Sequence, residues 1–370
     1  MATLPDPVDP TALAAWAQGV LPGEGALEVT PLGDGHSNLT FLVRRPGLIT
    51  EWVLRRPPMG PLLPTAHDVV REFRVLELLG RATTPVRVPA VVGVCEDLTV
   101  LGAPFYLMER TEGLVLRDQL PDWLADDHDA QHRLGLDLVD SLAEIHSADW
   151  APFVEAGIGR PGGYLERQLR RWTGQREGIR SAVAAAGGRA RELPDYDLTR
   201  DWLVAHLPDE GAPAVVHGDF KLDNAIVRPG GRSDGTGDGP SVAAVIDWEM
   251  ATVGDPRADL GYLLSFWPDD AAAGSGGEPA DQEGLMLGQL AIVGDGFPSR
   301  DELVARWAVR TGRDIGDTRW FVALALWKLA ILLEASYHRW LAGMATDPFF
   351  ATLDTGVPML LARARAVAGA

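Results

Sequence analysis

Polar residues able to do chemistry lie close together in the segment VVHGDFKLDN, residues 215–224. Asp219 and Asn224 are five positions apart, and Lys221 follows the aspartate by two. A second carboxylate, Asp247, ends an apolar run 23 positions beyond Asn224. Because apolar runs flank these residues, we expect them on loops at the edge of a core, facing a cleft.

Phosphoryl transfer to a hydroxyl group requires these residue types. One carboxylate accepts or orients the hydroxyl proton, while a carboxamide and a second carboxylate hold the Mg²⁺ ions that neutralise the nucleotide phosphates. A lysine beside the base can stabilise charge on the moving phosphoryl group. The order Asp219, Lys221, Asn224 and Asp247 meets all four requirements.

Two other classes of function are alternatives. The first is a metal-dependent hydrolase with His217, Asp219, Asp247 and Glu249 as ligands. Against it, no second histidine lies near these positions, and no ligand pair such as H-x-H or H-E-x-x-H is present there. The second is a non-catalytic nucleotide-binding protein with the same fold as the phosphotransferase.

Several ordered segments resemble the aminoglycoside phosphotransferase family: HGDFKLDN, IDWE, GDP and ADL, between His217 and Leu260. That family belongs to the protein-kinase-like group, with choline kinases and the kinase domains fused to some acyl-CoA dehydrogenases. The segments GDPRADLGYLL, WVLRRPP and YLMERTEG look most similar to that last branch. The resemblance covers about residues 27–345 and implies an α+β, protein-kinase-like fold with two lobes.

The resemblance also implies roles for the residues of the central segment. Asp219 would be the catalytic base with Lys221 beside it, and Asn224 and Asp247 would hold Mg²⁺.

Neighbouring residues receive different interpretations. Asp259 would brace the catalytic loop from a following helix. His217 is interpreted as a histidine that braces this loop rather than one that transfers protons. Asp223 is expected to face solvent, and the role of Glu249 stays open.

The phosphate-covering turn of the family resembles LGDGHSN, residues 32–38, where Gly33, Gly35, Ser37 and Asn38 would contact the nucleotide. Glycines let the backbone approach phosphate, whose oxygens backbone N–H groups then bind. Asn38 stands where G-x-G-x-x-G has its third glycine, and an ordinary hairpin is the alternative interpretation.

A cation that pairs with the phosphates is expected on the strand WVLR, residues 52–55. Protein kinases have lysine there, whereas this chain has Arg55, whose planar fork can bind phosphate bidentately. Arg56, on the other face of the strand, is the fallback. Glu72 is expected to pair with the arginine, with Glu77 as its competitor.

Adenine is expected against Met108, with hydrogen bonds to the main chain around Glu109 and Thr111. The predicted cofactors are therefore ATP, with GTP as the alternative, and Mg²⁺. The acceptor would be a hydroxyl of a small molecule, either aminoglycoside-like or of the hydroxyacyl type. Its contacts are expected from the helix at 327–340 and the insertion at 268–284. The oligomeric state is left open.

The elements that position these residues follow from local patterns. Helices are predicted over 9–19, 67–79 and 131–147, and most of 285–366 is predicted to be helical. Strands are predicted over 41–43, 52–54, 90–95, 105–108, 214–216, 225–228 and 242–246. We therefore expect a strand-rich N-terminal lobe (1–108), a hinge (109–114) and a helical C-terminal lobe (115–370).

Composition excludes several classes of protein. The 370 residues are 46% hydrophobic, which is incompatible with a disordered chain, and a net charge of −19 disfavours nucleic acid and anionic membranes as partners. The single cysteine, Cys95, and the acidic, proline-containing start favour a cytoplasmic protein. The apolar stretch 320–333 contains Lys328 and is too short to span a bilayer, so it predicts a core helix. Lys328 and Lys221 are the two lysines among 33 basic residues.

Overall fold

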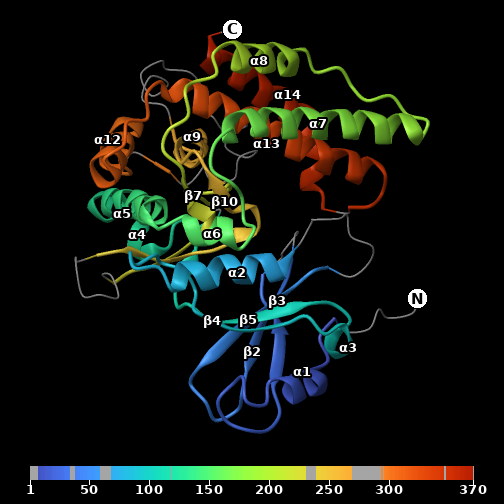
Figure 1. Ribbon diagram of the computed structural model, residues 1–370, viewed down its shortest axis with the longest axis vertical. Coiled ribbons are helices and arrows are strands. Elements are labelled where there is room, and N and C mark those ends of the chain that lie inside the picture. The colour runs from blue at the N-terminus through green and yellow to red at the C-terminus, as the bar shows by residue number, and fades with distance from the viewer. Residues whose placement is uncertain are drawn as a thin grey trace.

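The computed structural model describes residues 7–33, 38–58, 68–117, 119–230, 239–268, 293–294, 296–345 and 347–369. Figure 1 shows one antiparallel sheet at one end of the molecule and a group of helices at the other, with α2 (Val69–Gly80) crossing between them. The predicted α+β fold with a small sheet-containing lobe and a large helical lobe is confirmed. The lobe boundaries at 108 and 115 stay a prediction.

The N-terminal lobe is a five-stranded sheet in the order β1-β2-β3-β5-β4. Its strands are β1 (Glu28–Pro31), β2 (Leu39–Arg44), β3 (Glu51–Arg56), β4 (Val91–Cys95) and β5 (Phe105–Glu109). β2 and β3 form the predicted hairpin, with Phe41 opposite Leu54. Two short helices, α1 (Pro10–Trp16) and α3 (Leu98–Leu101), lie on this lobe and contact each other.

Local signals set the ends of the helices in this lobe. Asp9 caps α1 by accepting the N–H of Thr11 at 2.8 Å, and the helix ends at Trp16, three residues before the predicted end. Asp68 caps α2 by accepting the N–H of Arg71 at 2.9 Å. α2 contacts β4 and β5 of the sheet and the turn over Trp248–Met250 of the C-terminal lobe. A side chain of this helix can therefore lie between the two lobes.

The C-terminal lobe combines helices with two small sheets. Its helices are α4 (Asp122–Ala125), α5 (His128–Ser147), α6 (Ala151–Glu155), α7 (Tyr164–Ala185), α8 (Pro194–Ala205), α9 (Arg257–Ser265), α12 (Arg300–Thr311), α13 (Thr318–Leu341) and α14 (Phe349–Ala368). One sheet pairs β6 (Leu114–Val115), β8 (Ala225–Arg228) and β9 (Ser241–Val245), and the other pairs β7 (Ala214–Val216) with β10 (Thr252–Gly254). Most of the predicted insertion at 268–284 lies outside the described residues.

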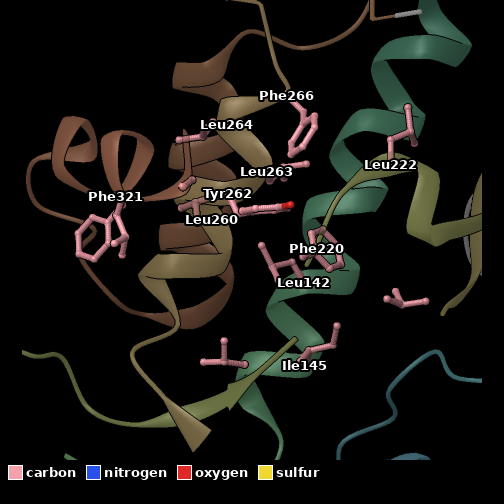
Figure 2. Close-up of a cluster of buried hydrophobic side chains, with 14 of the residues drawn as sticks. Leu142, Ile145, Phe220, Leu222, Leu260, Tyr262, Leu263, Leu264, Phe266 and Phe321 are labelled. Carbon is pink, nitrogen blue, oxygen red and sulfur yellow. The ribbon is translucent and has the colours of Figure 1, made fainter. Parts of the chain in front are cut away.

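The α13 helix is long and apolar enough to cross a membrane by length and composition, but most of its apolar stretch is buried within this lobe. It packs against α9 and α14, as the prediction of a core helix requires. The side chains around α9 form a continuous apolar cluster with α5 and with Phe220 and Leu222 (Figure 2). Each such buried side chain contributes roughly 1.5–3 kcal/mol, so this cluster anchors the segment that contains the candidate catalytic residues.

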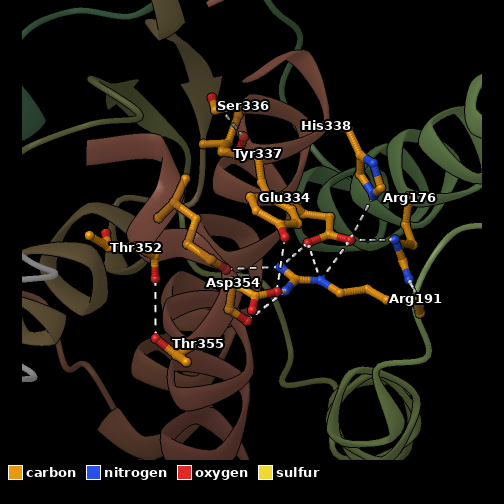
Figure 3. Close-up of polar contacts among 11 residues, drawn as sticks. Arg176, Arg191, Glu334, Ser336, Tyr337, His338, Thr352, Asp354 and Thr355 are labelled. Carbon is orange, nitrogen blue, oxygen red and sulfur yellow. Dashed lines mark hydrogen bonds and ion pairs between the residues drawn. The ribbon is translucent and has the colours of Figure 1, made fainter. Parts of the chain in front are cut away.

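A buried carboxylate, Glu334 on α13, joins the outer helices of the lobe (Figure 3). Its oxygens accept from Arg176 on α7 at 3.2 Å and from Arg191 at 2.5 Å, and His338 lies 3.1 Å away. Arg191 also donates to the carbonyl of Asp354 on α14 at 2.6 Å and stacks 4.4 Å above the ring of Tyr337. One carboxylate thus holds three helices and the α7–α8 connection together.

Replacing Glu334 by glutamine should destabilise the fold by about 3 kcal/mol, because it leaves buried arginine charge without a carboxylate. Urea unfolding followed by circular dichroism measures the change. The control is Glu166→Gln, which removes an exposed pair with Arg170 and should cost no more than about 0.5 kcal/mol. Equal, small effects of the two substitutions would contradict the assigned role of Glu334.

Candidate active site

Residues 217–224 contain the candidate catalytic residues and are called the catalytic loop for that reason; they follow β7 directly and end in a 3₁₀ turn over Leu222–Asn224. β7 pairs antiparallel with β10, with Val216 opposite Thr252. The N–H of Ile246 donates to the carbonyl of Asn224 at 2.9 Å. These pairings bring the residues after 217 beside those after 246, so two segments separated in the sequence form one site.

Asp259, buried on α9, holds the beginning of the catalytic loop. Its carboxylate accepts the N–H groups of His217 at 2.6 Å and Gly218 at 2.8 Å, and it lies 3.3 Å from Nε2 of His146. Burial would raise the pKa of Asp259, but the hydrogen bond from His146 and the charges around it hold the pKa below its usual range. The geometry is that of the bracing aspartate expected from the sequence.

Gly218 has a φ of +86°, and a Cβ there would lie 2.8 Å from the carbonyl oxygen of Met250. Glycine adopts this left-handed conformation without steric cost, so the residue type is required by the turn.

His217 uses both ring nitrogens on main-chain groups, one in the loop and one in the segment before Asp247. Nδ1 accepts the N–H of Asp219 at 3.2 Å, and Nε2 lies 3.0 Å from the carbonyl oxygen of Ile246, to which it therefore donates. Neither nitrogen is left for a metal or for proton transfer, which matches the bracing role that the sequence predicted.

Asp219 and Asn224 face each other across the loop. The amide nitrogen of Asn224 donates to the carboxylate of Asp219 at 2.9 Å and to its carbonyl at 2.8 Å. Burial would raise the pKa of Asp219, but the ammonium groups of Lys221 and Lys328 hold the pKa below its usual range. Asp219 is therefore an ionised carboxylate near neutral pH, able to accept a hydrogen bond from a hydroxyl.

Lys221 lies beside this carboxylate, with Nζ 4.0 Å from Asp219 Oδ2 and 3.2 Å from Asp223 Oδ2. Burial would lower the pKa of Lys221, but the two carboxylates raise it above its usual range. Asp223, expected to face solvent, thus forms an ion pair at the site.

Asp247 has a φ of +68°, and it is the one non-glycine residue with positive φ in the part of the chain that the structure describes. Such a backbone is sparsely populated and persists where the surroundings impose it, often at functional sites. The carboxylate lies 3.2 Å from Nη2 of Arg55, and the following N–H, of Trp248, donates to Glu72 at 3.2 Å.

Arg55 on β3 joins the two lobes at this point. Its Nη1 lies 3.2 Å from Glu72 Oε1, and its side chain is 10% exposed. Burial would lower the pKa of Arg55, but the carboxylates of Glu72 and Asp247 raise it. Burial raises the pKa of Glu72 to about 7, opposed by the charge of Arg55.

The competitors of this pair lie elsewhere. Arg56 donates to the carbonyl of Leu101 at 3.1 Å, on the other face of the sheet, and Glu77 pairs with Arg81 at 2.8 Å.

The predicted phosphate-covering turn is described only at its ends. Gly33 has a φ of +76°, and Asn38 is buried, with neither amide atom hydrogen-bonded to any of the residues that the structure describes. Gly35 and Ser37 lie outside the described residues.

The expected adenine contacts lie at the end of β5. Met108 is buried, while Glu109 and Thr111 are not. The Glu109 N–H donates to the carbonyl of Ala90 at 2.8 Å and is therefore already used within the N-terminal lobe. Adenine would have to bind other main-chain groups of this segment.

The donor set fits a hard divalent cation. Asn224 uses its amide nitrogen on Asp219, so its oxygen is the atom that can bind Mg²⁺, and Asp247 offers a carboxylate that is 29% exposed. Among the described residues, no group of three His, Cys, Asp or Glu side chains could hold a metal. A site with few protein ligands suits Mg²⁺, which is usually bound by one or two carboxylates and the substrate phosphates.

Sequence reasoning missed two residues at the site. Lys328 on α13 donates to the carbonyl of Gly218, and Tyr262 on α9 has its hydroxyl pointing toward the segment of Phe220 and Leu222 (Figure 2). A signal for Lys328 was present, because a lysine interrupts an apolar helix in a chain with two lysines. Nothing in the local pattern distinguishes Tyr262 from a core tyrosine.

A family model described as the phosphotransferase enzyme family matches residues 28–288, and the chain belongs to this family. Within it, the chain is 32% identical over 342 residues to acyl-CoA dehydrogenase family member 10 of Mus musculus and 33% identical over 328 residues to member 11 of Gallus gallus. The alignments cover 91% and 87% of this chain but 29% and 38% of those proteins. The chain therefore spans about a third of the length of these relatives.

Solved structures agree with this assignment. A candidate aminoglycoside phosphotransferase from Ralstonia eutropha superposes with a TM-score of 0.72 at 29% identity, covering 98% of each chain. A thermostable aminoglycoside phosphotransferase mutant bound to AMP-PNP and hygromycin B has a TM-score of 0.58 at 15% identity, covering 97% of this chain and 98% of that one. The predicted resemblance to aminoglycoside phosphotransferases and to the acyl-CoA dehydrogenase-associated branch is confirmed.

Asp259→Asn should destabilise the protein by about 2 kcal/mol, because an amide replaces a buried carboxylate that accepts two backbone N–H groups. The measurement is urea unfolding. In the control, Asp317→Asn, the carboxylate caps α13 at an exposed position, where asparagine caps nearly as well. Wild-type stability of Asp259→Asn would show that Asp259 does not hold the loop.

Proposed function

We propose that the protein transfers the γ-phosphate of ATP to a hydroxyl group of a small molecule, with Mg²⁺ as cofactor. One observation carries the proposal: Arg55 of the N-terminal lobe lies 3.2 Å from Asp247 of the C-terminal lobe, next to the loop of Asp219 and Asn224. The nearness of this cation to Asp247, Asn224 and the ionised carboxylate of Asp219 supports one site between the lobes, with two oxygen ligands for a metal.

Each residue has a separate task in the proposed reaction. Arg55 and the turn that ends at Asn38 bind nucleotide phosphates. Asn224 and Asp247 hold Mg²⁺, which neutralises charge on the phosphates when it is bound. Asp219 accepts the hydroxyl proton and aligns the oxygen for in-line attack, while Lys221 balances negative charge beside it.

Relatives with this fold support a nucleotide and a small-molecule acceptor. One aminoglycoside phosphotransferase was crystallised with AMP-PNP and hygromycin B, and another with ATP and streptomycin. At 15% and 17% identity these likenesses establish the fold and not the nucleotide. We propose ATP because these neighbours were crystallised with ATP or its analogue, and GTP remains the alternative. The acceptor is aminoglycoside-like or of the hydroxyacyl type, the latter favoured by the names of the longer relatives.

The hydrolase alternative loses its support because both nitrogens of His217 are used by main-chain groups, those of Asp219 and Ile246. The non-catalytic alternative rests on Arg55 in place of lysine and on Asn38 in place of the third glycine. Against it, Asn224 is hydrogen-bonded to Asp219, and Asp247 pairs with Arg55, which supports a site that keeps its polar residues.

Asp219→Asn should lower the rate of phosphoryl transfer by about 10²–10⁴, as loss of a positioned base does. The assay follows ADP release from Mg²⁺–ATP with hydroxylated acceptors, including aminoglycosides and hydroxyacyl-CoA thioesters. Asp317→Asn serves as the control and should retain the wild-type rate. Wild-type turnover of Asp219→Asn would reject the role of the base, and phosphoester hydrolysis without nucleotide would favour the hydrolase.

A further inference from the structure

The two lysines of this chain lie 107 residues apart in the sequence, and both reach the catalytic loop. Lys221 belongs to the loop itself, whereas Lys328 comes from the middle of α13 and donates to the carbonyl of Gly218. The other 31 basic residues are arginines. Lys328 is not one of the residues to which the proposed reaction assigns a task.

Burying the ammonium group of Lys328 at this position costs folding free energy. Lys328 is 8% exposed on an apolar helix, and burial lowers its pKa to about 8 despite the carboxylates of Asp219 and Asp259. The charges of Arg171 and Lys221 lower the pKa of Lys328 further. A buried ammonium group costs several kcal/mol unless it is paired and hydrogen-bonded, so packing alone does not explain the residue.

Aromatic rings compensate part of this cost. The ammonium group lies 4.7 Å from the ring centre of Tyr262 on α9 and 5.5 Å from that of Trp172 on α7. Cation–π contacts of this kind are worth about 0.5–2 kcal/mol each. Side chains of α7 and α9 thus hold the ammonium group of this α13 residue in a defined position.

The carbonyl that Lys328 binds belongs to the peptide plane immediately before Asp219. The N–H of the same plane, that of Asp219, donates to Nδ1 of His217 at 3.2 Å. The preceding plane is held through the Gly218 N–H, which donates to Asp259 at 2.8 Å. The peptide plane from which the Asp219 side chain departs is therefore held at both of its polar ends.

We infer that Lys328 is a positioning residue for phosphoryl transfer, which fixes the Gly218–Asp219 peptide plane and thereby the direction of the Asp219 carboxylate. This inference rests on the proposed function. Lys328 acts through the loop and does not itself contact the nucleotide or acceptor.

The test compares Lys328→Met with Lys328→Arg and with Ile331→Ala. Methionine has a similar volume; it removes an ammonium group whose burial is costly, and it leaves the Gly218 carbonyl without this donor, so we expect a folded protein with a modestly lower melting temperature. Arginine restores a donor to the Gly218 carbonyl. Ile331 is buried one turn further along the same helix, and its truncation lowers stability without removing a hydrogen bond to the loop.

In Lys328→Met, kcat of Mg²⁺–ATP turnover should fall about 10- to 100-fold, because a displaced catalytic group costs rates of that order. The KM for ATP should stay within about twofold, since the residue does not contact nucleotide. Lys328→Arg should recover part of kcat, and Ile331→Ala should keep kcat despite a lower melting temperature. Wild-type kcat in Lys328→Met would overturn the inference.

Amide hydrogen exchange separates this inference from the proposed function. Lys328→Met should speed exchange in the catalytic loop, whereas Ile331→Ala should speed exchange in α13 only. If the wild-type protein turns over no nucleotide, the proposed function fails, and exchange still decides whether Lys328 holds the loop. Unchanged exchange of the loop in Lys328→Met would overturn the positioning role.

Discussion

The structure depends on one buried charge contact between the lobes, in which the guanidinium group of Arg55 lies between the carboxylates of Glu72 and Asp247. These groups come from β3, α2 and the turn after β9. Arg55 and Glu72 are buried, so each of these charges requires its partner, and Asp247 completes the contact from a partly exposed position; the contact thus links the helix to the sheet and the sheet to the C-terminal lobe. In the proposed reaction the same cation binds the nucleotide phosphates, a task in which a bidentate arginine can take the place usually held by lysine.

The C-terminal lobe holds the catalytic loop through one buried carboxylate, one buried ammonium group and one histidine. Asp259 accepts its N–H groups, Lys328 donates to a carbonyl, and His217 links the loop to the segment before Asp247. Each of these groups is buried, and each would be costly if its partner were lost. The loop is therefore held in place next to the residue that carries the Asp219 carboxylate.

Most of the fold could be predicted from sequence, because periodicity and capping are local. The predicted strand at 225–228 matches β8, and the helix predicted over 131–147 begins three residues earlier because Asp127 caps it. The pairing of Arg55 with Glu72 was also foreseen, through resemblance. The contacts of Lys328 and the Arg191–Glu334 network were not, since residues far apart in the sequence meet only once the helices pack. The hydrogen bond that already uses the Glu109 N–H could not be predicted for the same reason, because its acceptor is the carbonyl of Ala90.

The most direct test of the proposed Mg²⁺–nucleotide site is the thermal stabilisation of the protein by ATP with and without Mg²⁺, in wild type and in Asp247→Ala. In the proposed reaction Asp247 holds Mg²⁺, and it lies 3.2 Å from Arg55, the proposed phosphate ligand. We expect a rise in melting temperature of the wild-type protein that requires Mg²⁺ and disappears in the variant, because a ligand that binds only the folded state stabilises it. No stabilisation of the wild-type protein by ATP or GTP, or an equal shift in Asp247→Ala, would contradict the proposed site.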